Sequence, residues 1–276
     1  MAERFPQKRV FITGAGSGLG LAIARQFATN GWRVAVTDVD PARARTALEE
    51  VRSCGGDGFW AECDVRSADH MEQARERLQQ EWAGVDVIVN NAGVGSAGTV
   101  IDTPLEDWEW VLDINLMGVV RGCHLFAPLL AAQRSGHIVN IASFAGIAQA
   151  PAMAGYNVAK IGVIGLSESL RAEMQPHGVG VSAVCPSFFK TNILEQFRSP
   201  DPRLRDVADK LVNRASVTAD DVAKDIFKGV QKNRFMIIPH AEARWFYRFK
   251  RFAPELFFKI LGPQAARMMG ADKSGR

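Results

Sequence analysis

The 276-residue sequence has little that suits a metal centre, a disulfide framework or a membrane span. Its four cysteines are widely scattered, and no pair has the spacing of metal ligands. No uninterrupted apolar segment reaches the roughly 18 residues needed to cross a bilayer, and residues 1–9 lack the apolar stretch of a signal peptide. These absences predict a cytoplasmic protein with reduced cysteines and no bound metal.

A strong charge excess, internal repeats and low-complexity segments are also missing. The formal net charge is only +3, which argues against a nucleic-acid partner. Hydrophobic residues make up 47% of the chain, enough for a large core, and the length suits an α/β fold. The chain has only two tyrosines, so a tyrosine in a suggestive setting is informative.

Short apolar runs alternate with segments of helical spacing along most of the chain. This pattern predicts a Rossmann-type α/β fold: a doubly wound parallel sheet with helices on both faces. Ligands of such sheets bind beyond the carboxyl ends of the strands. The expected strands are 10–12, 32–37, 58–63, 85–89, 137–141, 179–184 and 235–238. The expected helices are 19–30, 41–53, 68–82, 105–132, 154–175, 203–213 and 219–231.

A glycine-rich turn follows the first expected strand and opens the first expected helix. Glycines allow a tight turn and a close approach to a pyrophosphate, and the helix N-terminus offers N–H donors. The strand before the turn and the helix after it are the context that a dinucleotide site requires. The expected contacts in this turn are Gly14, Ser17, Gly18, Leu19 and Gly20.

Asp38 ends the second expected strand, eighteen residues after Gly20. A carboxylate at this place accepts both hydroxyls of an adenosine ribose and repels a 2′-phosphate. Val39 follows, and the glycine turn contains no Lys or Arg that would neutralise an extra phosphate. The sequence therefore favours NAD over NADP, although a solvated loop acid is the alternative explanation of Asp38.

Further polar groups follow the third and fourth strands. Asp64 could accept a hydrogen bond from the adenine amino group, with Val65 beside it. Asn91, Ala92 and Gly93 could line the cofactor. For Asn91, and for Asn90 before it, a purely structural role in bracing the sheet is equally open.

Tyr156 and Lys160 stand four residues apart, a spacing that places both side chains on one face of a helix. A nearby fixed ammonium favours the phenolate form and lowers the pKa of a tyrosine. We therefore expect the pair to act as a general acid/base close to neutral pH. Ser143, thirteen residues earlier, could hydrogen-bond a substrate oxygen.

Taken together, these motifs resemble the short-chain dehydrogenase/reductase family. The matching residues occur in the family's order and spacing from about residue 8 to residue 192: Thr13-Gly14-x-x-x-Gly18-x-Gly20, Asp64, Asn90-Asn91-Ala92-Gly93, Asn115, Ser143 and Tyr156-x-x-x-Lys160. The resemblance implies an NAD(P)-dependent oxidoreductase with a single Rossmann-type domain, which in this family is often tetrameric. One departure is Pro186-Ser187, where the family usually has Pro-Gly.

The resemblance also implies roles for individual residues. Tyr156 would take the proton from a substrate hydroxyl, and Lys160 would lower its pKa and hold the nicotinamide ribose. Asn115 would hold a water that links Lys160 to solvent, with a satisfied core amide as the alternative. Pro186 and Thr191 would contact the cofactor.

The residues after the sixth strand predict the class of substrate. Phe188 and other apolar side chains between Ser187 and Pro202 would form one wall of the cleft, and Met153 would lie in the opposite wall. An apolar cleft favours a lipophilic secondary alcohol or ketone over a sugar or a charged acid.

We expect residues 1–240 to form the catalytic domain and 241–276 to form a helical extension. The extension carries eight basic and three acidic residues, with seven aromatic rings between them. Packing against the body or a neighbouring subunit is the favoured interpretation. An amphipathic helix on an anionic membrane surface and a lid over the substrate cleft are the alternatives.

The sequence thus predicts an oxidoreductase that transfers a hydride between NAD and a lipophilic secondary alcohol or ketone, in a homodimer or homotetramer. An NADPH-preferring carbonyl reductase is the alternative enzyme. A sensor or scaffold that binds dinucleotide without turnover is the alternative class, and Ser143, Tyr156 and Lys160 together argue against it.

Overall fold

A computed structural model describes residues 4–260 of the chain. Its centre is a parallel seven-stranded sheet with the order β3-β2-β1-β4-β5-β6-β7. The strand order reverses between β1 and β4, which is where an open α/β sheet forms its ligand crevice. The strands are β1 (Arg9–Thr13), β2 (Arg33–Asp38), β3 (Asp57–Glu62), β4 (Val87–Asn90), β5 (Gly136–Ile141), β6 (Val179–Val184) and β7 (Met236–Ile237).

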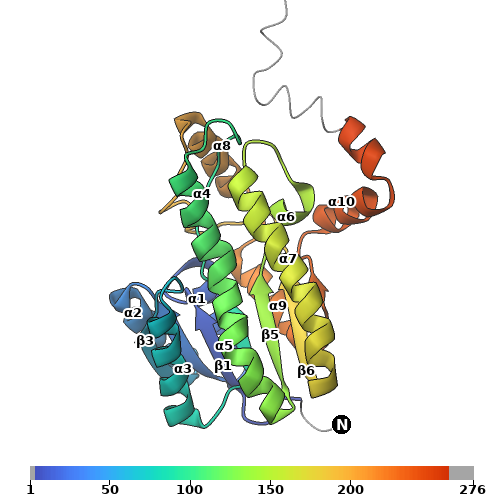
Figure 1. Cartoon of the computed structure of the whole chain (residues 1–276). Helices are drawn as coiled ribbons and strands as arrows, with labels where there is room; N and C mark the ends of the chain where they lie inside the picture. The colour runs from blue at the N-terminus through green and yellow to red at the C-terminus, as the bar shows by residue number, and fades with distance from the viewer. Residues whose placement is uncertain (1–3, 261–276) are drawn as a thin grey trace, which may run out of the picture.

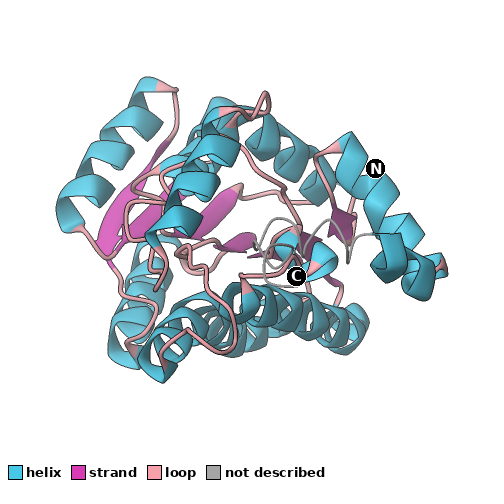
Figure 2. Ribbon diagram, turned by 90° about the horizontal axis from the view of Figure 1, so that it is seen from above, coloured by secondary structure: helices cyan, strands magenta, loops and turns pink. Residues whose placement is uncertain are grey.

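Helices cover both faces of the sheet (Figures 1 and 2). One layer consists of α1 (Gly18–Thr29), α2 (Pro41–Ser53) and α9 (Ala219–Gln231). The other consists of α3 (Ala68–Trp82), α5 (Gly118–Gln133) and α7 (Ala154–Met174). Alternation along β1 supplies both cores, since Val10 and Ile12 pack in the first layer and Phe11 in the second. The predicted doubly wound fold is confirmed.

Local sequence signals account for several helix starts. Asp40 caps α2 by accepting hydrogen bonds from the amides of Ala42 and Arg43, and Pro41 occupies the first helical position. Thr218 and Asp221 form a reciprocal capping box at the start of α9. Such caps explain why most expected helix starts lie close to the observed ones.

The long expected helix at 105–132 is interrupted by a different conformation. It divides into α4 (Leu105–Leu112), a π-helical segment (Asp113–Met117) and α5, which continues through Pro128. The stretch Leu105–Gln133 is long and apolar enough to cross a membrane, by length and composition alone. In the fold it lies against β4, β5 and α7, and less than half of its most apolar window is buried.

Short elements also surround the carboxyl end of the sheet. A helical turn, α6 (Ala145–Ala148), follows β5, and a 3-10 turn (Gln175–His177) follows α7. Helix α8 (Pro202–Asn213) lies at the same end as α6 (Figure 1). Neither α6 nor the 3-10 turn is predicted by the sequence pattern, because each is too short to show a periodicity.

The expected extension begins as a helix. α10 (Ala241–Phe252) is followed by a second helical stretch at residues 254–260. The rest of the expected extension, 261–276, lies outside the described residues, and with it the charged residues Arg267, Asp272, Lys273 and Arg276.

Candidate active site

The glycine turn between β1 and α1 fits a pyrophosphate. Gly14 has a φ of +62°, and a Cβ there would lie 2.9 Å from the Cα of Ala92. A Cβ on Gly20 would collide with the carbonyl oxygen of Gly14. Side chains are therefore excluded from the turn, and the first N–H groups of α1 remain free for an anion. Ser17, the residue before α1, makes no side-chain capping bond.

Asp38 is buried at the end of β2 and faces this turn. Its carboxylate accepts hydrogen bonds from the amides of Gly16 (2.9 Å) and Asp40 (3.0 Å). The position suits a ribose, because each carboxylate oxygen retains room for another donor. Arg43 of α2 lines the same part of the site. This arginine pairs with Glu195 at 2.7 Å and with Asp40 at 3.4 Å.

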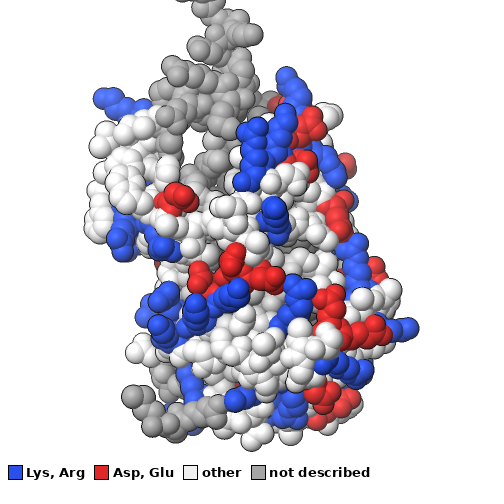
Figure 3. All heavy atoms as spheres, turned by 180° about the vertical axis from the view of Figure 1, so that it is seen from behind, with Lys and Arg blue, Asp and Glu red and all other residues white. Residues whose placement is uncertain are grey.

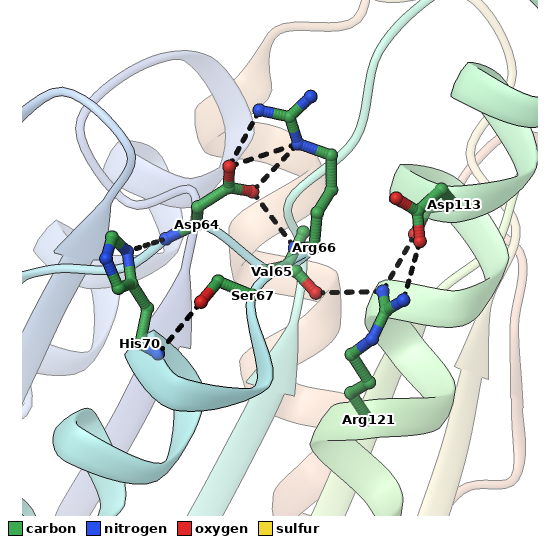
Figure 4. Close-up of polar contacts among 7 residues, drawn as sticks. All are labelled: Asp64, Val65, Arg66, Ser67, His70, Asp113 and Arg121. Atoms are coloured by element: carbon green, nitrogen blue, oxygen red, sulfur yellow. Dashed lines mark hydrogen bonds and ion pairs between the residues drawn. The ribbon is translucent and has the colours of Figure 1, made fainter.

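The turn after β3 is fixed by a polar network (Figure 4). Arg66 holds the Asp64 carboxylate at 2.7 Å, and this hydrogen-bonded pair lowers the pKa of Asp64. Arg121 of α5 donates to the carbonyl oxygen of Val65 at 3.1 Å and pairs with Asp113 at 2.6 Å. The turn after β3 is therefore tied to the helix layer, and Asp64 already has one cationic partner.

The asparagines after β4 brace the sheet. The side-chain amide of Asn91 donates to the carbonyl oxygens of Thr13 (2.9 Å) and Gly14 (3.0 Å). Asn90 donates to Asn140 at 2.8 Å in the buried interior. These contacts favour the structural interpretation of both side chains, while Asn91, Ala92 and Gly93 also line the site.

Ser143, Tyr156 and Lys160 meet at the other end of the site. Ser143 follows β5 and hydrogen-bonds Tyr156, which lies on α7. The ammonium of Lys160 lies 5.7 Å from the centre of the Tyr156 ring and donates to the carbonyl oxygen of Ile141 at 2.9 Å. All three side chains line the same space, and Tyr156 and Lys160 are buried.

The titration of this pair differs from the sequence-based expectation. Burial raises the pKa of Tyr156 to about 12, and the hydrogen bond from Ser143 only partly opposes it. Burial likewise lowers the pKa of Lys160 to about 8. Desolvation thus dominates the titration of Tyr156, and the expected lowering of its pKa is wrong.

Asn115 lies in the π-helical segment and is fully buried. Its side-chain oxygen accepts from the amide of Val94, and its side-chain nitrogen donates to the carbonyl oxygen of Val94, both at 2.8 Å. A Cβ on Gly93 would lie 2.8 Å from the Asn115 oxygen and 3.6 Å from the Lys160 nitrogen. Asn115 therefore holds the wall of the site beside Lys160. Its contacts favour the alternative interpretation of this residue as a core amide with all its hydrogen bonds satisfied.

The loop after β6 is held from the C-terminal side. The amide of Ser187 donates to Nδ1 of His240 at 3.2 Å. With Nδ1 accepting, the other ring nitrogen donates to the carbonyl oxygen of Phe188 at 3.1 Å. The backbone where the family usually has Pro-Gly is thus fixed by a histidine immediately before α10. Pro186 accepts a hydrogen bond from the amide of Phe144.

All but one of the predicted site residues line a single cavity of about 520 Å³, and Asn115 is the exception. Thr191 lies beside Gly18, where an added Cβ would be 3.2 Å from its hydroxyl. Phe188, Phe189 and Phe197 lie in the apolar wall with Met153 and Trp110. The loop that carries Phe197 is tied to α4 by Arg198, which pairs with Asp107 at 3.1 Å.

Five contacting residues were not anticipated from the sequence: Arg43, Arg66, Arg121, Glu195 and His240. Arg43 pairs with a residue 152 positions away, and His240 contacts backbone more than 50 positions away. No local pattern marks such partners. The only signal in the sequence was a charged or imidazole side chain near an expected strand end, and such side chains are too common to be informative.

Comparison with known proteins agrees with the fold. The family model for short chain dehydrogenases matches residues 8–202. This chain therefore belongs to the short-chain dehydrogenase/reductase family.

Individual relatives share most of the chain. A short-chain dehydrogenase/reductase from Burkholderia phymatum, solved in complex with NAD, superposes with a TM-score of 0.86 at 30% identity, covering 92% of this chain and 96% of that one. A 3-oxoacyl-[acyl-carrier-protein] reductase from Staphylococcus aureus is 32% identical over 79% of this chain and 93% of its own length. The probable oxidoreductase EphD of Mycobacterium tuberculosis is 35% identical over 91% of this chain, which spans only 44% of EphD.

Proposed function

We propose that this protein transfers a hydride between NAD and a lipophilic secondary alcohol or ketone, with Tyr156 as general acid/base. The observation that carries the proposal is the single cavity with Asp38 at one end and Ser143, Tyr156 and Lys160 at the other. When bound, a nicotinamide dinucleotide supplies the hydride acceptor or donor.

The proposed roles of the side chains follow from their contacts. In alcohol oxidation the Tyr156 oxygen takes the hydroxyl proton, while Ser143 donates a hydrogen bond to the substrate oxygen. Lys160, held by the carbonyl of Ile141, keeps its charge close to Tyr156. Because burial raises the pKa of Tyr156, the phenolate depends in this step on the Ser143 hydrogen bond and on the nearby charge of Lys160.

NAD preference rests on the free lone pairs of Asp38 and on its negative charge. Arg43 favours the alternative, an NADPH-preferring carbonyl reductase, because its guanidinium lines the same part of the cavity. That guanidinium already pairs with two carboxylates, Asp40 and Glu195, which reduces the positive charge that it offers to a 2′-phosphate. NAD therefore remains the preferred cofactor in this proposal.

The phenylalanine-lined wall supports an apolar substrate. An acyl thioester with a 3-oxo or 3-hydroxy group belongs in the same test, because some relatives are named 3-oxoacyl-[acyl-carrier-protein] reductases. A panel of secondary alcohols, ketones and 3-hydroxyacyl thioesters, assayed with NAD and NADP by nicotinamide absorbance, identifies the substrate. Turnover confined to sugars or charged acids would contradict the proposed class.

Tyr156→Phe tests the mechanism, because it removes the proton acceptor and keeps the ring. We expect turnover to fall at least ~10²-fold, the lower end of general acid/base contributions. Fluorescence titration with NADH serves as the control for folding and should give unchanged affinity. Turnover close to that of the wild type would contradict the role of Tyr156.

We further propose that residues 1–240 form the catalytic unit, in a cytoplasmic homodimer or homotetramer. Support for self-association comes from apolar side chains that remain about 40% exposed on adjoining helices: Met117, Val158 and Ile161. Val158 and Ile161 share a face of α7, and the π-helical segment with Met117 packs beside that helix.

A further inference from the structure

Helix α10 has one face on the protein body. Ala243 is buried, and the Lys250 ammonium donates to the carbonyl oxygen of Ile147 (2.7 Å) and to the side chain of Gln149 (2.8 Å). The Phe246 ring lies 6.1 Å from the ring of Phe144. These contacts seat α10 on α6, the turn that follows Ser143, and Figure 1 shows the two helices side by side.

The opposite face of α10 presents aromatic rings to solvent. Trp245, Phe249 and Phe252 recur at the spacing of one helical face, and we call them the outer stripe. Trp245 is 67% exposed and Phe252 is 84% exposed, while Phe249 between them is half-buried. Phe257, from the stretch at 254–260, packs beneath Phe249 and is itself buried.

Basic residues surround the outer stripe. Arg244, Arg248 and Arg251 are exposed, and none of them forms an ion pair within residues 4–260. Residues 241–260 contain five basic and two acidic side chains. Seen from behind, the region of α10 at the upper left of Figure 3 is largely white with blue atoms at its rim.

The positive charge around the outer stripe distinguishes between the partners that an aromatic face can bind. A symmetric contact between two copies would place the same basic patch against itself, which is repulsive. An anionic lipid surface attracts the arginines and accepts the rings at its headgroup level. We propose that the outer stripe and its arginines bind the surface of an anionic bilayer.

The place of α10 gives this contact a consequence for substrate access. α6, on which α10 rests, contributes Ala145 and Ala148 to the wall of the cavity. A bilayer at the outer stripe would therefore be separated from this wall of the cavity by α10 and α6. We infer that the enzyme takes its lipophilic substrate from the membrane phase. This step rests on the proposed function.

Vesicle flotation of the full chain tests the binding. We expect binding to vesicles of phosphatidylcholine with phosphatidylglycerol, no binding to phosphatidylcholine alone, and weaker binding at high salt. Arg248→Glu should weaken binding about tenfold or more, since it removes one attraction and adds one repulsion. The double variant Trp245→Ser with Phe252→Ser should also weaken it, through loss of the inserted rings.

Lys232→Glu is the matched control, because Lys232 is an exposed cation just past the C-terminus of α9. It precedes the amino end of β7, whereas α10 follows the carboxyl end of that strand. Lys232→Glu should leave binding unchanged. Turnover of a short, water-soluble alcohol by each variant is measured in parallel and should stay at the wild-type level, which separates failure of membrane binding from failure of the proposed reaction.

Four results would overturn the proposal. The first three are equal flotation with neutral and anionic vesicles, equal loss of binding in Lys232→Glu and Arg248→Glu, and a change of sedimentation in the stripe variant without any loss of flotation. The third result would assign the stripe to contact between copies. Capture of an acidic acyl carrier protein without vesicle binding would assign the arginines to a protein partner instead.

Discussion

At Lys160 the chain buries an ammonium, and this placement costs stability. Burial lowers the pKa of Lys160 to about 8 from an ordinary value of 10.5. Between these two pH values the unfolded chain binds more protons than the folded one, so the free energy of unfolding rises with pH. Below about pH 8 the full penalty is present.

Lys160→Met removes the charge and keeps an apolar side chain of similar length. We expect the wild type to gain stability relative to this variant, on the order of 3 kcal/mol, as pH rises from 8 to 10.5. Urea unfolding of both proteins at several pH values measures it. Because all other groups are shared, a difference that stays constant across this range would show that Lys160 titrates normally.

Asp38 sets the proposed cofactor preference at the residue scale. The wild type should bind NADH more tightly than NADPH, because the 2′-phosphate would face an unpaired carboxylate. Asp38→Ala should bring the affinities for NADH and NADPH closer together. Adding Arg43→Ala to that variant should reverse part of the change, since Arg43 is the nearby cation. Fluorescence titrations with NADH and NADPH measure the ratio of the two affinities. A ratio unaffected by Asp38→Ala would assign selectivity to other residues.

Residue positions were predictable where a local motif specified them. The glycine turn, Asp38, Ser143, Tyr156 and Lys160 all face one cavity, as their places at strand ends and on one helix face implied. Protonation was not predictable, because the pKa of Tyr156 depends on how completely the folded chain removes water from it.

At the scale of elements, α10 contributes to stability through its inner face. Truncation after His240 should destabilise the body by about 2 kcal/mol, comparable to exposing one buried aromatic ring, and lower the Tm by ~4–8 °C. Differential scanning calorimetry compares it with the full chain. Lys250→Met, which loses only the contacts to α6, should show a smaller decrease in Tm.

An unchanged Tm after truncation would show that the contacts between α10 and α6 contribute nothing to folding. Aggregation of the truncated protein would have a separate cause, since Phe144 would lose its cover. Sedimentation before heating distinguishes the two outcomes.

Elements were predictable in kind and less so in detail. The expected strand at 85–89 forms at Val87–Asn90, and the long helix contains a π-helical segment at Asn115. Apolar periodicity marks a helix but does not reveal one extra residue in a turn. The wider turn occurs at Asn115, whose side chain bonds both the amide and the carbonyl oxygen of Val94.

For the whole molecule, we expect self-association through the exposed face of α7. Ile161→Arg places a charge at the proposed interface and should shift the protein toward a monomer in sedimentation velocity. Ile101→Arg is the matched control, because Ile101 is 92% exposed in a loop distant along the chain, and it should leave the oligomer intact. Equal sedimentation of wild type and Ile161→Arg would exclude this face.

The overall topology was predictable because strands and helices alternate and parallel strands need crossover helices. Contacts between distant segments were not, since they depend on how the elements assemble. The seating of His240 on the loop at Ser187 and Phe188 is one example. The pairing of Arg43 with Glu195 is another.

That last pair has a kinetic consequence. Arg43 belongs to α2 and Glu195 to the loop after β6, and both border the cavity. Since both side chains are more than 40% exposed, the pair is weak and opens readily. We expect this contact to slow cofactor release, and the dissociation rate of the cofactor to increase with ionic strength.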